Sequence, residues 1–351
     1  MLQDDPRVSA KICIVIGDLA TPECAGSEFS HTETPAIIVQ NSEGLCDALL
    51  QAAFREESGF DDGLSHEAFS ALLDLTRYNG NMMMLGNLLE RVIRLLDDVP
   101  VRVPQAKRES IYNGILMCMT FCLNQIETWE TKVETGRITA IFDRIILLFQ
   151  HERKAFPDGL HCMLPIIRIM GKDFTPYVTT YWAAIFYPIL DAPTDLEMMK
   201  AIFDVMGHLN EYDCLNSERY QIILDRVLDC INDKAVHSEF KPQLFSILGA
   251  MSFKYVHIFN NRVADILGIF EHAYRAAINP DVHNDENISE YYESFQTHII
   301  EGMGVLAYEA LGMFAIHPKG REELYNHLRH LEEFIFETCD SKWNPTLVNF
   351  S

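Results

Sequence analysis

The sequence predicts an all-α protein, a solenoid built from stacked antiparallel helix pairs. Two observations predict this class. Apolar residues recur at helical spacing in pairs of stretches, each pair divided by a short joint, and the clearest pair lies at residues 241–278. Such pairs follow one another along the chain, and no convincing alternating strand pattern interrupts them. Because one pair cannot bury its apolar face alone, stacked pairs that share a continuous core are expected.

The pair at 241–278 shows the pattern in most detail. Pro242 suits the first turn of its first helix, where backbone N–H groups have no intrahelical partner, and Asn260 and Asn261 suit the N-cap of its second helix. The apolar stripes comprise Leu244, Phe245, Ile247, Leu248 and Met251, then Val263, Ile266, Leu267, Phe270 and Tyr274. A pair of roughly 40 residues has the length of a HEAT or armadillo repeat.

The other helices are expected in the same arrangement, with Val8, Ile12, Ile16 and Leu19 as the stripe of the first one. The predicted helices are 5–20, 44–54, 64–78, 82–96, 108–126, 138–149, 160–170, 177–190, 199–206, 220–231, 241–252, 262–278, 289–311 and 322–339. They group into one solenoid over residues 1–351. Its approximately seven repeats are expected at 5–54, 64–98, 104–150, 158–191, 194–232, 238–278 and 287–339, and residues 340–351 are expected to begin a truncated repeat. A globular helical bundle is the structural alternative.

Composition excludes several classes of function. The formal net charge of −23 argues against nucleic-acid binding, which needs a basic surface, and permits a receptor for basic ligands. No apolar run approaches the roughly 18 residues of a membrane span, and the acidic N-terminus does not resemble a signal peptide. Nine scattered cysteines, among them Cys118 and Cys122 one turn apart, are expected to be reduced core thiols.

Motifs of enzymes and metal sites are missing from the sequence. It contains no GxxxxGK[ST], GxGxxG, HExxH or GxSxG, and no Cys/His cluster with metal-ligand spacing. We therefore expect a binding protein with no catalytic residue, no cofactor and no metal.

Several segments, taken in order, resemble the importin beta family of nuclear transport receptors. The stretch KPQLFSILG, with SFKYVHIF and RVADILGIFEHA after it (241–273), resembles a late HEAT repeat of that family. DPRVSAKICIVIGDLA (5–20) resembles the helix that opens a middle repeat, and GKDFTPYVTTYWAAIFYPIL (171–190) is similar to the segment before and through a B helix, the second helix of a repeat. HSEFKPQ (237–243) and the helix at 289–311 follow at the expected distances.

The resemblance covers nearly the whole chain but only the second half of the family. Nothing resembles the N-terminal repeats that hold the GTPase Ran in that family, so the chain looks like a C-terminal fragment or a divergent short form. The resemblance implies a transport receptor of the cytoplasm, nucleus and nuclear pore, which acts as a monomer without membrane insertion and is linked to Ran through the full-length protein.

In this family the B helices line the concave face, which wraps a basic helix of the adaptor importin alpha or of a cargo. Carboxylates on stacked B helices would attract such a helix. The candidates are Glu90, Asp143, Asp225, Asp229, Asp265 and Glu271. Trp182 and Tyr181 could pack on Lys and Arg stems. The alternatives are an ordinary solvated acidic face for the carboxylates and inter-repeat core for the aromatic residues.

The family also binds phenylalanine-glycine (FG) repeats of nucleoporins, in shallow grooves between A helices, the first helices of the repeats. The candidates on those helices here are Leu164, Ile167, Phe203, Met206, Phe245 and Leu248. Each of these residues is alternatively part of the core, since stripe residues at helical spacing usually pack. A different HEAT scaffold, such as the phosphatase 2A scaffold subunit, is the second functional hypothesis, although its uniform repeats near 39 residues fit the unequal spacing here less well.

Overall fold

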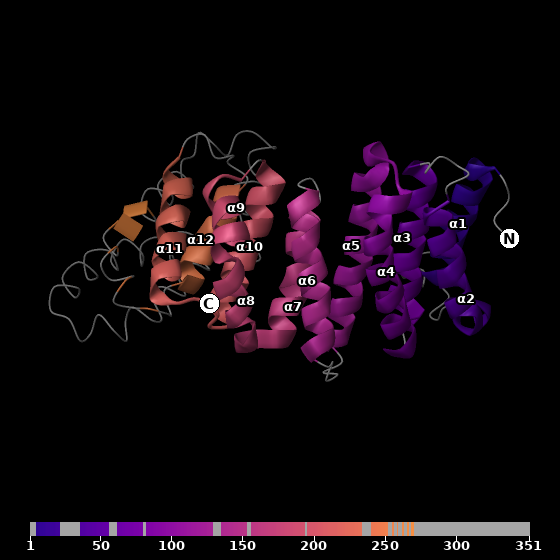
Figure 1. The fold of residues 1–351 in the computed structure, drawn as a ribbon, viewed down its shortest axis with the longest axis horizontal. Helices are drawn as coiled ribbons and strands as arrows, with labels where there is room; N and C mark the ends of the chain where they lie inside the picture. Colours follow the sequence, from indigo (N-terminus) through magenta and orange to yellow (C-terminus); the bar gives the residue numbers. More distant parts are fainter. Residues whose placement is uncertain are drawn as a thin grey trace, which may run out of the picture. The chain divides into compact units, whose positions relative to one another are not determined.

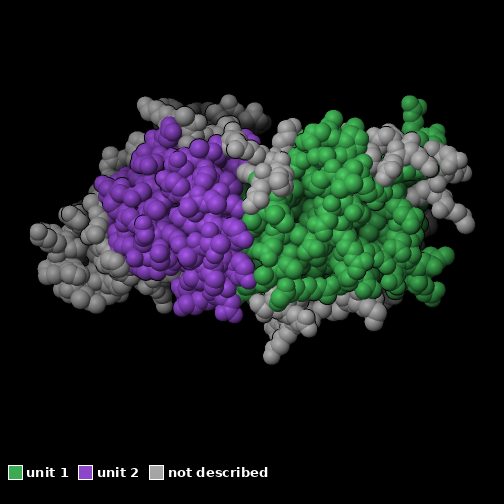
Figure 2. Space-filling view, in the orientation of Figure 1, with its two compact units in different colours: residues 1–170 green, residues 171–351 purple. Residues whose placement is uncertain are grey.

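The computed structural model describes residues 5–21, 36–55, 62–79, 82–128, 135–152, 156–193, 195–233 and 240–251, and the single residues 255, 258, 262, 265, 266, 268 and 269. Every element within these ranges is helical, and none of the described residues forms a strand (Figure 1). The predicted helices at 289–311 and 322–339, most of the helix at 262–278, and Glu271 lie outside the described residues. The chain forms two compact units, residues 1–170 and 171–351 (Figure 2).

The first unit contains two rows of helices. Its helices are α1 (Pro6–Ala20), α2 (Ala36–Ala53), α3 (Asp62–Asn79), α4 (Met82–Arg102), α5 (Gln105–Thr128), α6 (Thr135–His151) and α7 (Phe156–Met170). Odd-numbered helices pack in chain order, α1 on α3, α3 on α5 and α5 on α7, while α4 contacts α6 in the other row. Each even-numbered helix also packs on the odd-numbered helix that follows it, so the core lies between the two rows.

The second unit repeats this arrangement in its described part. It contains η3 (Gly171–Phe174), α8 (Thr175–Tyr181), η4 (Trp182–Phe186), α9 (Tyr187–Asp191), α10 (Leu196–Glu211), α11 (Ser217–Asn232) and α12 (Lys241–Met251). The element η4 is a turn of π-helix that joins α8 and α9 into one helical run. Helix α10 contacts α12, α9 packs on α10, and α11 packs on α12, so α10 and α12 take the A positions.

Short polar side chains begin three of these helices. The carboxylate of Asp5 accepts a hydrogen bond from the backbone N–H of Arg7 at 2.9 Å, with Pro6 in the first turn of α1. The carboxylate of Asp195 likewise accepts a hydrogen bond from the backbone N–H of Met198 in α10. The amide oxygen of Asn216 accepts one from the backbone N–H of Arg219 in α11. These caps satisfy N–H groups that have no partner within the helix.

Several helices are longer than predicted, and the reason is clearest for α2 and α4. Helix α2 begins at Ala36, eight residues before the predicted start at 44, because Ile38 and Ser42 continue the buried face that leads to Cys46. The polar Ser42 hides this stripe in the sequence, but its hydroxyl donates to the carbonyl of Val39 at 3.0 Å. Helix α4 runs on to Arg102 because Val99 is also buried.

Helix α1 buries a different face from the one predicted. Its fully buried residues are Ser9, Cys13, Gly17 and Ala20, and the predicted stripe was wrong, since Val8 and Leu19 are 37% and 47% exposed. A Cβ atom on Gly17 would lie 3.4 Å from the Cα of Ala71, so the small residues let α1 approach α3 closely. Dense packing at short range outweighs the burial of larger side chains here.

The cysteines agree with the expectation of core thiols. All seven cysteines among the described residues are free and buried. Burial raises the pKa of Cys46, Cys122 and Cys162 to about 12 in each case. These thiols therefore stay protonated and unreactive near neutral pH.

Tyr220 is a buried polar anchor in the second unit. Its side chain is fully buried, its hydroxyl donates to the backbone carbonyl of Met251 at the end of α12, and its ring lies 5.1 Å from that of Tyr255. Burial raises the pKa of Tyr220 well above its usual value, so the hydroxyl remains a neutral donor. The bond joins α11 to the last turn of α12, whose carbonyls have no partners within the helix.

Replacing Tyr220 with phenylalanine should lower the free energy of unfolding by about 1–3 kcal/mol, because the buried carbonyl of Met251 loses its donor. Urea unfolding followed by circular dichroism measures the change. Tyr187→Phe is the matched control, since Tyr187 is 40% exposed, and its effect should stay within about 0.5 kcal/mol. Equal stabilities of the two variants would contradict an energetic role for the bond.

Candidate functional site

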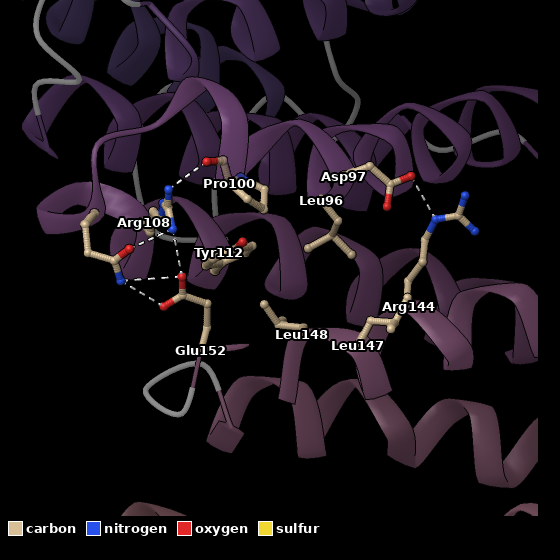
Figure 3. Close-up of a pocket in the computed structure, with 10 residues that line it drawn as sticks. Leu96, Asp97, Pro100, Arg108, Tyr112, Arg144, Leu147, Leu148 and Glu152 are labelled. Atoms are coloured by element: carbon tan, nitrogen blue, oxygen red, sulfur yellow. Dashed lines mark hydrogen bonds and ion pairs between the residues drawn. The ribbon is translucent and has the colours of Figure 1, made fainter. Parts of the chain in front are cut away.

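An open groove lies in the first unit between α4 and α6, with the N-terminal part of α5 as its floor (Figure 3). Its volume is about 630 Å³, within the range of roughly 300–1,000 Å³ that is usual for ligand pockets. Apolar walls come from α4 and α6, and two arginine–carboxylate pairs lie at its ends. The lining residues are Leu96, Asp97, Pro100, Gln105, Arg108, Tyr112, Arg144, Leu147, Leu148 and Glu152.

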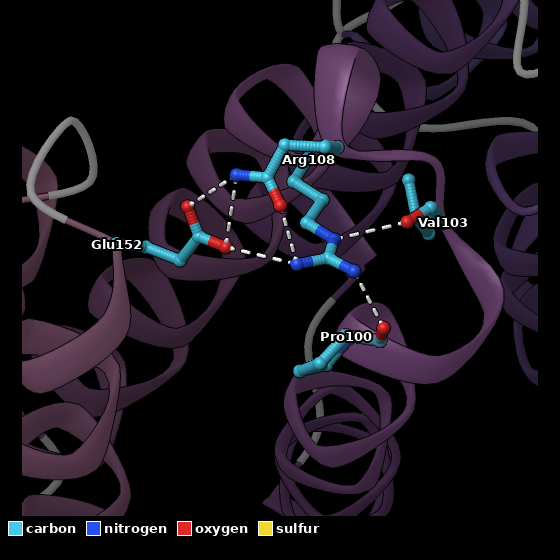
Figure 4. Close-up of polar contacts among 5 residues, drawn as sticks. Pro100, Val103, Arg108 and Glu152 are labelled. Atoms are coloured by element: carbon cyan, nitrogen blue, oxygen red, sulfur yellow. Dashed lines mark hydrogen bonds and ion pairs between the residues drawn. The ribbon is translucent and has the colours of Figure 1, made fainter.

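Arg108 holds one end of the groove together (Figure 4). Its guanidinium donates to the backbone carbonyls of Pro100 at 2.6 Å and Val103 at 3.0 Å, which close the C-terminal end of α4. It also donates to Gln105 at 2.6 Å and to the carboxylate of Glu152 at 3.2 Å, just beyond α6. One side chain therefore joins three helices, and both members of the ion pair are largely buried, with exposures of 21% and 15%.

The other end of the groove carries a more exposed pair. Nε of Arg144 on α6 donates to the carboxylate of Asp97 on α4 at 3.1 Å. The wall between the two ends consists of Leu96 on α4 opposite Leu147 and Leu148 on α6 (Figure 3). Leu147 is 54% exposed, whereas Leu96 and Leu148 are only 6% and 7% exposed, so the wall meets solvent mainly at Leu147.

Tyr112 contributes the polar group of the floor. The residue is only 2% exposed but lines the groove. Burial, and secondly the carboxylate of Glu152, raise the pKa of Tyr112 to about 12, while Arg108 opposes the rise. Its hydroxyl is therefore neutral at physiological pH, and no hydrogen-bond partner for it occurs among the residues that the structure describes.

Arginines on the B helices neutralise many of the carboxylates on the preceding B helix. Arg91 on α4 pairs with Asp47 on α2, and Arg137 on α6 lies 3.8 Å from Glu90 on α4. In the second unit, Arg226 on α11 donates to the carbonyl of Leu190 on α9 at 3.1 Å. These partners are 36 to 47 residues apart in the sequence, the spacing of a repeat, so the arginines connect consecutive repeats.

Three of the six predicted acidic site residues form ion pairs with arginines of the chain. Glu90 pairs with Arg94 as well as Arg137. Asp225 and Asp265 both contact the guanidinium of Arg262. The predicted carboxylates therefore do not form one unoccupied acidic array, because the chain's own arginines already bind three of them.

Asp143 on α6 and Asp229 on α11 differ from the other acidic candidates. Both are exposed, and within the described part of the chain neither carboxylate has a hydrogen bond or an ion pair. Asp225 and Asp229 lie one turn apart on α11, as predicted from their spacing. Of this pair, only Asp229 has a carboxylate with no cationic partner among the residues that the structure describes.

Trp182 lies at the π-helical turn and is partly exposed. The guanidinium of Arg219 on α11 lies 5.5 Å from the centre of the Trp182 ring and also donates to Thr179 at 3.1 Å. The ring of Tyr187 lies 6.5 Å from Trp182. An arginine therefore does stack on this tryptophan, as expected for a basic ligand, but the arginine belongs to the chain itself.

The candidates for nucleoporin binding are mainly buried. Ile167, Phe203, Met206 and Leu248 are fully buried, Phe245 is 2% exposed, and Leu164 is partly exposed. Their burial agrees with the alternative that they belong to the core. Of the six, only Leu164 offers surface to a ligand without movement of its neighbours.

Sequence reasoning missed the groove. The one feature of the sequence that could have indicated the groove is Leu147, an apolar residue one turn from Asp143 on the polar side of α6. The remaining lining residues come from three helices and the segments at their ends, and nothing in the sequence indicates that they meet.

Two kinds of site are absent from the described residues. No described helix is long and apolar enough to cross a membrane. No group of three or more His, Cys, Asp or Glu side chains in the described ranges could hold a metal ion.

The two rows of helices and the arginines that connect repeats define a helical-repeat protein, and comparison with solved structures identifies the fold as a HEAT-repeat solenoid similar to that of Kap95. One matching structure is of Kap95 (importin beta), whose binding induces the switch loops of RanGDP to adopt the GTP-bound conformation. It has a TM-score of 0.66 and 18% sequence identity to this chain. A structure of the Kap95:Nup1 complex matches with a TM-score of 0.68 and 17% identity.

Each match covers 97% of this chain and 38% of the Kap95 chain. No model of a known protein family matches the sequence, and neither does any curated protein. The all-α solenoid predicted from the sequence is therefore confirmed.

Proposed function

We propose that this protein is a carrier of the importin beta type in nucleocytoplasmic transport, which binds polypeptide segments without covalent chemistry. The observation that carries the proposal is the structural match along 97% of the chain to Kap95, which was solved in complexes with Ran and with Nup1. The partners proposed are a basic adaptor or cargo helix and FG nucleoporins, with Ran engaged through the full-length protein.

The basic ligand is assigned to the B-helix side of α11, where Asp229 is exposed and Asp225 is already paired with Arg262. A lysine or arginine of the ligand can bind Asp229 directly, whereas it must displace Arg262 to reach Asp225. Arg219, near the start of α11, lies over the ring of Trp182, and this contact supports the proposal that a guanidinium can stack on this side. A substitution of Asp229 therefore tests the proposed basic-ligand site more directly than a substitution of Asp225.

A pulldown with two baits tests the proposal, a basic importin-alpha N-terminal helix and an FG-repeat peptide, each at physiological salt. Both should bind the full chain, and only binding of the basic helix should weaken steeply as salt is raised. Asp229→Lys should lower affinity for the basic helix about fivefold, since an exposed charge contact contributes up to about 1 kcal/mol, and should not change FG binding.

Glu197→Lys is a matched charge reversal at an exposed position on α10, an A helix, and should leave the affinity for the basic helix unchanged. The carrier hypothesis fails if neither bait binds. Equal affinity of the wild-type protein and Asp229→Lys for the basic helix removes Asp229 from the site.

A further inference from the structure

The groove between α4 and α6 has the composition of a binding site for an apolar group. Leu96, Leu147 and Leu148 line its sides, and Tyr112 lies next to Arg108 and Glu152 at one end (Figure 3). The exposed part of this wall is Leu147, at 54%, whereas Leu96 and Leu148 are 6% and 7% exposed and form the wall behind it. A group that buries this wall would gain roughly 25 cal/mol for each Å² of apolar surface removed from water.

The charged residues at the ends of the groove exclude a charged occupant. Glu152 is bound by Arg108, and Asp97 is bound by Arg144. Each carboxylate and each guanidinium thus has a partner of opposite charge within the chain, so the lining carries no net charge. A charged ligand would be desolvated in the groove without gaining an unpaired counter-charge.

The Tyr112 hydroxyl adds a specific requirement. Tyr112 is only 2% exposed, and its hydroxyl has no hydrogen-bond partner among the described residues. Because the phenol stays neutral at physiological pH, it can donate one hydrogen bond to an acceptor in the groove. A backbone carbonyl of a peptide is such an acceptor.

We infer that this groove is a docking site for an uncharged peptide segment of a partner protein, which inserts an aromatic or branched aliphatic side chain between α4 and α6 and accepts a hydrogen bond from Tyr112 through a backbone carbonyl. The inserted side chain contacts Leu96, Leu147 and Leu148. This site lies on the B-helix row of the first unit, and none of its lining residues is among those assigned to the basic helix or to FG binding. It does not depend on a role in transport.

The test uses the full chain and the blocked tripeptide N-acetyl-Ala-Phe-Ala-amide with a fluorinated ring, observed by fluorine NMR. Binding should be saturable and in the millimolar range. Leu147→Asp should weaken it at least tenfold, because a carboxylate replaces the apolar wall. Tyr112→Phe should weaken it about three- to tenfold, as expected for one lost hydrogen bond.

Val101→Asp is the matched control, because Val101 is 86% exposed and does not line the groove, and it should leave the affinity unchanged. The corresponding peptide with aspartate or lysine in place of phenylalanine should not bind. The inference is overturned if the phenylalanine peptide does not bind, if Leu147→Asp binds it as the wild type does, or if a charged peptide binds equally well. An unchanged affinity in Tyr112→Phe overturns the assignment of the hydrogen bond.

Discussion

Replacing Gly114 with alanine should lower the free energy of unfolding of the first unit by about 3 kcal/mol, the upper part of the range for overpacked cores. A Cβ atom at this position in α5 would lie 2.1 Å from Cδ2 of Phe69 and 2.5 Å from two further ring atoms. Phe69 on α3 is 2% exposed, and its ring packs edge-on against Phe54 at 6.5 Å. The ring therefore cannot turn away without disturbing α2 and α3, and this cost exceeds the roughly 1 kcal/mol by which alanine improves a helix.

Gly44→Ala is the matched control for this prediction. Gly44 also lies inside a helix, α2, but no atom lies within 4 Å of the position that its Cβ would take. Alanine there should raise stability by about 0.5–1 kcal/mol. Urea unfolding should give opposite signs for the two variants, and combining Gly114→Ala with Phe69→Leu should recover part of the loss. If both glycine variants are stabilised, the close contact between α3 and α5 is not as described.

Replacing Arg108 with alanine should lower the free energy of unfolding by about 2–4 kcal/mol. The change removes the donor from two carbonyls at the end of α4 and the cation from Glu152, whose side chain is only 15% exposed and keeps just the hydrogen bond from Gln105 at 3.3 Å (Figure 4). Arg108→Lys should be intermediate, because one ammonium group cannot reach the same acceptors as a planar guanidinium. Unfolding by urea and the melting temperature should report the same order.

Arg94→Ala controls for the loss of an arginine that pairs with a carboxylate. Arg94 pairs with Glu90 one turn away, and its side chain is 73% exposed. Its replacement should change stability by no more than about 0.5 kcal/mol. A loss in Arg108→Ala no larger than that in Arg94→Ala would show that the Arg108 cluster does not stabilise the ends of α4 and α6.

Helical periodicity was sufficient for the fold class and for most helices. The predicted pairs at 64–78 with 82–96 and at 108–126 with 138–149 correspond to α3 with α4 and to α5 with α6. The errors have local causes. Ser42 concealed the start of α2 because a serine can be buried when its hydroxyl bonds to the preceding turn, and α1 buries small residues that hydropathy does not single out.

Much less of the candidate site could be predicted from the sequence. Glu90, Asp225 and Asp265 are on the predicted helices, but only the structure pairs them with Arg137 and Arg262. The net charge of −23 gave no indication that carboxylates on one B helix are neutralised by arginines of the next. Pairing depends on which residues of consecutive repeats become neighbours, and the variable lengths of the connections conceal that register.

The sequence by itself determined that the chain is an all-α repeat protein, because helical periodicity is a property of neighbouring residues and each helix records it locally. Only the tertiary structure decided which polar groups remain available to a ligand. Arg108, Tyr112 and Leu147 form one groove because α4, α5 and α6 pack together, and the same packing leaves the Tyr112 hydroxyl without a described partner. Binding surfaces of a solenoid form between repeats, so their chemistry depends on contacts between residues that are far apart in the chain.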